Sequence, residues 1–90
     1  MYYVYLLKSA NDGKLYIGRT DHLKQRLKDH NKGKVFTTKN KLPVQLVYYE
    51  SYRNREDSKI REKRIKKSGS VYMALKKRIA KSLNIKKTET

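Results

Sequence analysis

With 90 residues the chain has the length of one small domain, and its hydrophobic content of 37% is enough to fold one. The 24 Lys and Arg residues against eight Asp and Glu give a net charge of +16, which predicts a polyanionic partner, nucleic acid ahead of an anionic membrane surface. The absence of cysteine excludes disulfides and thiolate metal sites and favours a cytoplasmic protein. The apolar run at residues 2–7 is too short for a signal-peptide core or a membrane span.

The first 18 residues predict a β-hairpin. Residues 2–8 are rich in aromatic and branched side chains on both faces, which favours a strand covered on both sides. The turn ends in Asn-Asp-Gly, residue types that accept the positive φ of tight hairpins, and residues 14–18 form the return strand. If Tyr5 pairs with Tyr16 or with Gly18, both phenols emerge on one face, and a slip of one residue separates them.

Four more elements are expected after the hairpin. They are a helix, a strand and two helices, at residues 20–31, 44–49, 55–67 and 71–83. The first helix would begin with Thr20 as N-cap and Asp21 in the first turn, where the helix dipole favours an acid. The strand follows Pro43. The last helix has the clearest pattern, because apolar residues recur at every fourth position from Val71 to Leu83.

This order predicts an α+β fold. We expect a three-stranded sheet, antiparallel at least in the hairpin, flanked by three helices in the order ββαβαα. The domain would cover residues 1–83, and residues 84–90 would form a polar C-terminal tail.

Tyr5 and Tyr16 are the first candidates for chemistry. In one interpretation they are strand tyrosines that pack in the core with their hydroxyls at its rim. In the other, a phenol positions or deprotonates a water, which needs a nearby cation because the pKa of a free phenol is about 10. Arg19 and Arg26 are candidates for that cation.

Arg26 and His30 lie one helical turn apart in the first expected helix, beside its buried leucines. Arg26 is either a solvated surface charge or a fork of donors that neutralises a phosphate. His30 is either a polar neighbour of Arg26 or a donor or acid near a leaving oxygen.

Glu62 stands inside a dense basic run and close to an apolar residue on the helix at residues 55–67. It is either an i,i+4 partner of Lys66 or a ligand for Mg²⁺ or Mn²⁺, since Mg²⁺ keeps several waters and takes other oxygens from phosphate. A metal that polarises the phosphate would suit such a site. The sequence has no carboxylate cluster for two metals and no His and Cys set for zinc.

Much of the basic surface is expected to face phosphates and to add affinity without sequence information. The residues that we assign to nucleic-acid binding are Arg19, Lys24, Lys34, Lys39, Arg61, Lys63, Lys66 and Lys67.

These residues together resemble the GIY-YIG nuclease superfamily, most closely its small stand-alone members. The two name-giving motifs correspond to Tyr3-Val4-Tyr5 and Tyr16-Ile17-Gly18. The later matching positions, in family order, are Arg26, His30, Phe36-Thr37-Thr38, residues 43–50 and Arg61-Glu62-Lys63. The match covers residues 2–80. Arg19 replaces the lysine that often follows the second motif, and the late asparagine of some members has no counterpart.

The resemblance implies a three-stranded antiparallel sheet and a DNA endonuclease that leaves a 5′-phosphate and a 3′-hydroxyl. It implies Glu62 as the ligand of one Mg²⁺ or Mn²⁺, Arg26 on the scissile phosphate, and Tyr5 or Tyr16 as the group that activates or positions water. Because the chain shows no separate recognition domain, we expect weak or structure-based specificity unless a protein partner supplies more. The expected partner is nucleic acid, DNA before RNA, and not a membrane.

Two other interpretations stay open. A non-catalytic DNA- or RNA-binding module of the same fold would bind with a steep salt dependence and would need no metal. A structural or adaptor role in a repair or ribosomal assembly would need a protein partner and an exposed apolar patch. The combination of Tyr5, Tyr16, Arg26 and Glu62 favours the nuclease, because binding alone needs no carboxylate among cations.

Overall fold

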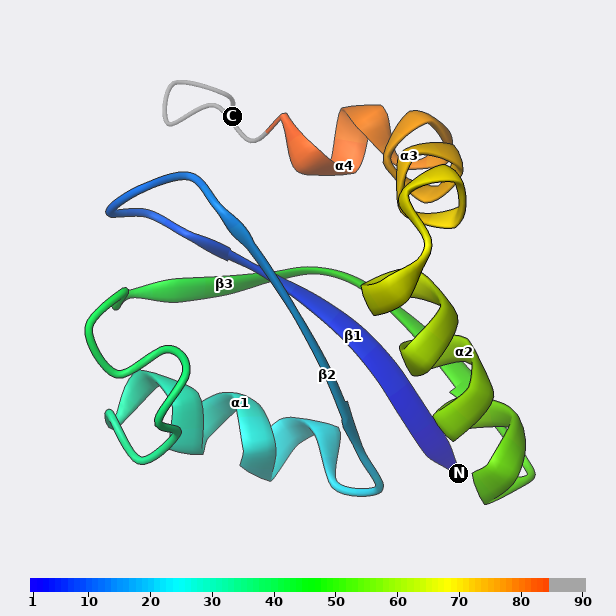
Figure 1. The fold of residues 1–90 in the computed structure, drawn as a ribbon. Helices are drawn as coiled ribbons and strands as arrows, with labels where there is room; N and C mark the ends of the chain where they lie inside the picture. Colours follow the sequence, from blue (N-terminus) through cyan, green and yellow to red (C-terminus); the bar gives the residue numbers. More distant parts are fainter. Residues whose placement is uncertain (85–90) are drawn as a thin grey trace.

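The computed structural model describes residues 1–84 and has the expected α+β architecture (Figure 1). Its elements are β1 (Tyr2–Ser9), β2 (Leu15–Thr20), α1 (Leu23–Asn31), β3 (Val44–Tyr52), α2 (Arg55–Lys67), α3 (Gly69–Arg78) and α4 (Ala80–Leu83). The predicted tail lies outside the described residues except for Asn84. No helix within residues 1–84 is long and apolar enough to cross a membrane.

The three strands form one antiparallel sheet in the order β2-β1-β3. The central strand β1 is buried from Val4 to Leu7, which agrees with the prediction of a strand covered on both sides. In the register of the hairpin, Tyr5 lies opposite Gly18 and Leu7 lies opposite Tyr16. Tyr5 and Tyr16 therefore share one face of the sheet, since paired residues point to the same side.

Helices cover the two faces of the sheet separately, with α1 on one side and α2 and α3 on the other (Figure 1). On the α2 and α3 side, the alternate β1 residues Val4 and Leu6 pack in a core with Ile65. On the α1 side, Tyr5 and Leu7 form a second cluster, against which leucines of α1 pack. Each fully buried aliphatic side chain contributes about 1.5–3 kcal/mol, so both faces of β1 stabilise the fold.

The first helix begins later than the sequence predicted, and Thr20 is not its N-cap. Thr20 pairs with Tyr3 as the last residue of β2, and its Oγ1 accepts a hydrogen bond from the backbone N–H of His22 at 3.0 Å. Helix α1 starts at Leu23, so Asp21 precedes its first turn. Pairing with β1 keeps this stretch extended because the ladder bonds of a strand compete with the first turn of a helix.

The C-terminal helices also differ from the prediction. Ser68 caps α3, accepting a hydrogen bond from the N–H of Val71, so this helix starts at Gly69. The single helix expected up to Leu83 is interrupted at buried Ile79, whose φ of −112° and ψ of 24° depart from helical values. The strand β3 runs to Tyr52 instead of residue 49, because Tyr2 of β1 pairs with it.

Candidate active site

A cleft of about 410 Å³ opens beside the edge strand β2. The predicted site residues that line it are Tyr5, Tyr16, Arg19, Arg26, His30, Lys34, Glu62 and Lys66. They come from both strands of the hairpin, from α1, from the loop that follows α1, and from α2. Since α1 and α2 cover opposite faces of the sheet, the cleft gathers side chains from both faces around one sheet edge.

Gly18 makes room for the Tyr5 side chain at this edge. The two residues are cross-strand partners, and a Cβ atom added to Gly18 would overlap Oη and Cζ of Tyr5. The phenol ring therefore lies directly over the Gly18 backbone, and Tyr5 is only 2% exposed. The glycine of the Tyr16-Ile17-Gly18 motif is a steric requirement for the placement of Tyr5.

Tyr5 starts a buried chain of hydrogen bonds. Its hydroxyl lies 2.8 Å from Nε2 of His30, and Nδ1 of His30 lies 2.7 Å from Oγ1 of Thr38. His30 is 4% exposed and Thr38 is fully buried. Thr38 belongs to the loop after α1, so the imidazole is held between the central strand and this loop.

The charge states of this chain follow from its burial. Burial, and then the positive charge of Arg26, lower the pKa of His30, so its imidazole is neutral at pH 7. Burial raises the pKa of Tyr5, although Arg26 acts in the opposite direction, so the phenol keeps its proton. We therefore assign Tyr5 as the donor to Nε2, which leaves the Nδ1 proton to be donated to Thr38.

Glu62 enters the cleft from α2 among cations. Nε of Arg19 lies 3.8 Å from its Oε1, and Nζ of Lys66 lies 3.2 Å from its Oε2. The expected i,i+4 pair with Lys66 is thus present, but 22% of the Glu62 side chain stays exposed to the cleft. Among the described residues, Nε of Arg19 is buried and makes no hydrogen bond, so its contact with Glu62 is an ion pair only.

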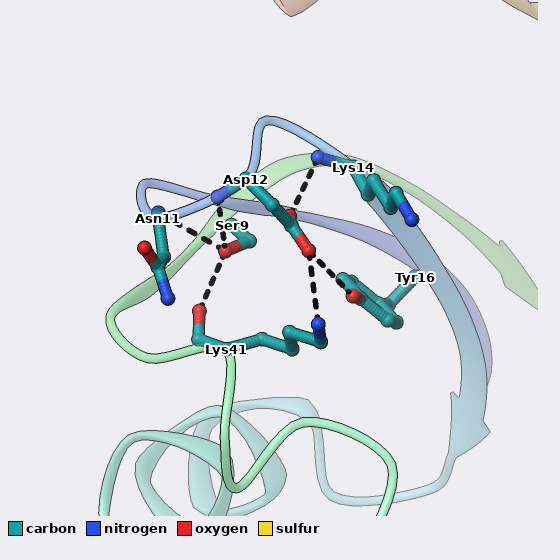
Figure 2. Close-up of polar contacts among 6 residues, drawn as sticks. All are labelled: Ser9, Asn11, Asp12, Lys14, Tyr16 and Lys41. Carbon is teal, nitrogen blue, oxygen red and sulfur yellow. Dashed lines mark hydrogen bonds and ion pairs between the residues drawn. The ribbon is translucent and has the colours of Figure 1, made fainter.

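Tyr16 lines the same cleft, but its hydroxyl points to the hairpin turn (Figure 2). It donates a hydrogen bond to Oδ2 of Asp12 at 3.3 Å, and Nζ of Lys41 lies 3.4 Å from the same oxygen. The turn is fixed to the loop by Ser9, whose Oγ donates to the Lys41 carbonyl at 2.6 Å. Burial and the neighbouring Asp12 raise the pKa of Tyr16. The two tyrosines therefore have different hydrogen-bond partners.

The predicted nucleic-acid-binding residues divide between the cleft and other surfaces. Arg19, Lys34 and Lys66 line the cleft, and Nζ of Lys39 lies 5.0 Å from the ring centroid of Phe36 at its wall. The others do not line it: Lys24 lines a separate groove between α1 and the sheet, Arg61 forms a bidentate pair with Glu50 at 2.9 Å, and Lys63 and Lys67 are exposed on α2.

Two residues were given no role from the sequence: Gly18, which lines the cleft, and Thr38, which is buried behind it against His30. Gly18 could have been identified, because pairing of Tyr5 with Gly18 was one of the two registers expected to place both phenols on one face of the sheet. For Thr38 the only indication was its place in the segment Phe36-Thr37-Thr38, which resembles the family. Its contact with His30 depends on how the loop closes over α1, and the local sequence does not determine that.

The donors around Glu62 limit the kind of metal site that it could form. Within residues 1–84, no group of three or more His, Cys, Asp or Glu side chains could hold a metal ion. One carboxylate fits Mg²⁺ or Mn²⁺ if water and substrate phosphate supply most of the remaining oxygens. The cations beside Glu62 can neutralise such a phosphate.

Comparisons with known proteins place the chain among proteins of one domain family. The GIY-YIG catalytic domain family matches residues 1–76. A UPF0213 protein of Clostridium perfringens is 44% identical over 68 residues, which are 74% of this chain and 72% of that protein. A UPF0213 protein of Bacillus pumilus is 41% identical over 66 residues, 72% and 66% of the two chains. The solution NMR structure of a UPF0213 protein from Bacillus halodurans is similar with a TM-score of 0.59 and 25% identity, covering 100% of both chains.

Proposed function

Because the chain belongs to the GIY-YIG family of catalytic domains, we propose that it is a divalent-metal-dependent endonuclease that hydrolyses DNA phosphodiester bonds and leaves 5′-phosphate and 3′-hydroxyl ends. The observation that carries this proposal is the convergence of Arg26, Glu62 and the Tyr5–His30 hydrogen bond on one cleft. Family membership supports the class of reaction, and the side chains in the cleft support its chemistry in this protein.

Arg26 and Arg19 are the groups that bind the scissile phosphate in this proposal. Both line the cleft, and the Arg19 side chain is partly exposed there. A guanidinium can give two parallel hydrogen bonds to phosphate oxygens. Such preorganised donors stabilise the charge that develops on the phosphate in the transition state.

Tyr5 and His30 supply a path for the proton of the attacking water. The Tyr5 hydroxyl donates to the neutral Nε2 of His30, so it can accept a proton from water while it passes its own to the imidazole. Tyr16 is the alternative base. Its bond to Asp12 makes it the weaker choice, because hydrogen bonding in the turn lowers the pKa of Asp12, which is therefore a poor acceptor for the phenol proton.

Glu62 would hold the Mg²⁺ or Mn²⁺ ion, the remaining ligands being water and phosphate. When bound, the metal would polarise the phosphate and neutralise part of its charge. Arg19 and Lys66 would keep the carboxylate oriented toward the cleft through their ion pairs with it.

Weak or structure-based specificity is part of the proposal, with a protein partner as a source of further selectivity. The net charge of +16 supports binding to the nucleic-acid backbone, and the cysteine-free sequence supports a cytoplasmic location. The alternative is a DNA- or RNA-binding module without catalysis, which the many exposed cations would also support.

The test is a cleavage assay on labelled DNA and RNA in single-stranded, duplex, nicked, flapped and branched forms, each with Mg²⁺, Mn²⁺ or EDTA. We expect metal-dependent products that Glu62→Gln loses by at least about a hundredfold. Glu56→Gln is the matched control, because Glu56 is an exposed acid on the same helix that pairs with Lys59. Equal cutting by Glu62→Gln and wild type would contradict the proposed role of Glu62, and salt-sensitive binding without cleavage of any substrate would favour the binding module.

A further inference from the structure

Phe36 is an exposed aromatic side chain in the wall of the candidate active-site cleft. It is 82% exposed, more than any other large hydrophobic residue that the structure describes, and it is the one phenylalanine in the sequence. The same cleft contains Arg26 and Glu62. A phenyl ring exposed in the wall of a polar cleft is available to stack on a ligand that has a flat apolar face.

The residues around Phe36 hold it in this place. Val35 before it is buried, and Thr38 two residues after it is fully buried. The backbone N–H of Thr38 donates to the Val35 carbonyl at 3.2 Å, and its Oγ1 lies 2.7 Å from Nδ1 of His30. The loop is thus anchored on both sides of Phe36, so the ring is presented from a fixed turn.

The charges near Phe36 indicate the chemistry of the ligand. Nζ of Lys39 lies 5.0 Å from the ring centroid, and Lys34 and Lys66 line the same cleft. An aromatic ring among cations suits a nucleotide, whose base stacks on the ring while its phosphates meet the charges. An apolar protein partner would have to desolvate these ammonium groups, which disfavours it.

We propose that Phe36 is a stacking platform for the nucleobase next to the scissile phosphate. In an intact duplex both faces of each base are already stacked, so the ring can engage only a base that is unpaired or has left the helix. The substrate class is therefore nucleic acid with a free base at the cut, as in a flap or a single strand. This inference rests on the proposed nuclease function for the location of the cut.

Base stacking can be measured without cleavage. The probe is a 5′-flap DNA with 2-aminopurine as the unpaired base at the junction, bound to wild-type protein in EDTA, with the same fluorophore inside an intact duplex as comparison. We expect quenching of the flap probe only, because stacking on an aromatic ring quenches this base. Phe36→Ala should remove the quenching and weaken flap binding by about fivefold to a hundredfold, the range for loss of one stacked base.

Three further variants separate stacking from other effects. Phe36→Trp should keep the quenching, while Phe36→Leu, which is apolar but has no ring, should lose it. Tyr49→Ala, at an exposed aromatic residue outside the cleft, should leave the quenching unchanged. Because Phe36 is exposed, its variants are expected to melt at the wild-type temperature, which circular dichroism checks. Equal quenching and equal affinity for Phe36→Ala and wild type would overturn the inference.

Cleavage assays on flap and duplex substrates distinguish a failure of the stacking inference from a failure of the proposed nuclease function. If wild type cuts in Mg²⁺ and Phe36→Ala keeps the same flap-to-duplex ratio, the stacking inference fails while the nuclease stands. If quenching depends on Phe36 but no substrate is cut, the nuclease proposal fails while the nucleobase site stands.

Discussion

The hydroxyl of Tyr5 lies 2.8 Å from Nε2 of His30, which joins the central strand to α1 across 25 positions of sequence. The two rings also pack edge to face, with centroids 5.7 Å apart and planes at 77°. This packing and the bond from Nδ1 to Thr38 fix the orientation of the imidazole. His30 is therefore a preorganised acceptor for the Tyr5 proton, and its protonation state should control the site.

The first prediction concerns pH. The pKa of His30 is lowered from 6.5 by burial and by Arg26, so the proposed cleavage should persist below pH 6.5 and be lost only when the lowered pKa is reached. In the unfolded chain the imidazole has its ordinary pKa of about 6.5, so it takes up a proton at a higher pH than in the folded protein. The free energy of unfolding should therefore fall as the pH drops below that value. NMR titration of the imidazole and chemical denaturation between pH 5 and 8 are the measurements. His30→Gln should remove the slope and exposed His22→Gln should not, and an unshifted His30 pKa would contradict the prediction.

The second prediction concerns Thr38. Thr38→Val keeps the volume but removes the hydroxyl, which leaves the buried Nδ1–H of His30 without a partner and should cost about 1–3 kcal/mol of unfolding free energy. The proposed cleavage should fall as well, because the imidazole loses its fixed orientation. Thermal denaturation and the NMR signal of the Nδ1 proton measure the effect. Thr37→Val, at an exposed position, is the control for stability, and equal melting of both variants would refute a positioning role.

The third prediction concerns Gly18. In Gly18→Ala the added methyl overlaps the Tyr5 phenol, so the ring must move or β2 must shift, and overpacking of this kind costs about 1–3 kcal/mol. The hydrogen bond to His30 should be lost with it. Gly69→Ala is the control, because an added methyl there has no atom within 4 Å. Denaturation curves and cleavage rates of the two variants are compared, and a fully stable, active Gly18→Ala would show that Tyr5 has room to relax.

The fourth prediction separates the two tyrosines. Tyr5→Phe removes the group that donates to His30 and should reduce the proposed cleavage by about a hundredfold or more. Tyr16→Phe removes a 3.3 Å bond to Asp12 in the turn and should have the smaller effect. Single-turnover rates with saturating enzyme measure the chemical step for both. The opposite order would identify Tyr16 as the base that accepts the proton of water.

The fifth prediction concerns the network around Glu50 on β3. Its carboxylate accepts both hydrogen bonds of Arg61 and those of Tyr48 and Tyr52. Burial opposes ionisation of Glu50, but these bonds outweigh it and lower its pKa, while burial and Glu50 raise the pKa of both tyrosines to about 12.

Glu50→Ala should therefore lower the free energy of unfolding by about 1–3 kcal/mol. This is less than the loss expected when a fully buried ion pair is broken, because the Arg61 side chain is partly exposed to solvent. Urea denaturation measures the effect, with exposed Glu56→Ala as control. Tyrosinate absorbance should also show two groups in the wild type that ionise only near pH 12. An unchanged urea midpoint for Glu50→Ala would show that the network contributes little.

Much of the fold follows from local sequence. The bounds of α2 agree with the prediction at both ends, and the side chain of Asn54 caps the helix by accepting a hydrogen bond from the backbone N–H of Glu56. The hairpin follows from Gly13, whose φ of 72° the turn requires. Thr20 shows the opposite, because this residue type suits an N-cap, yet Thr20 pairs with Tyr3 as the last residue of β2. Local propensity decided the ends of elements only where no partner strand competed.

The sequence by itself determined the α+β class, the family resemblance and the set of candidate side chains, because these depend on composition, periodicity and motif spacing. Only the tertiary structure decided which candidates meet. It set the hairpin register that puts Tyr5 over Gly18, closed the loop that brings Thr38 to His30, and turned Arg61 to Glu50 instead of the cleft. These contacts join residues far apart in the chain, and their geometry depends on how helices on opposite faces of the sheet pack around its edge.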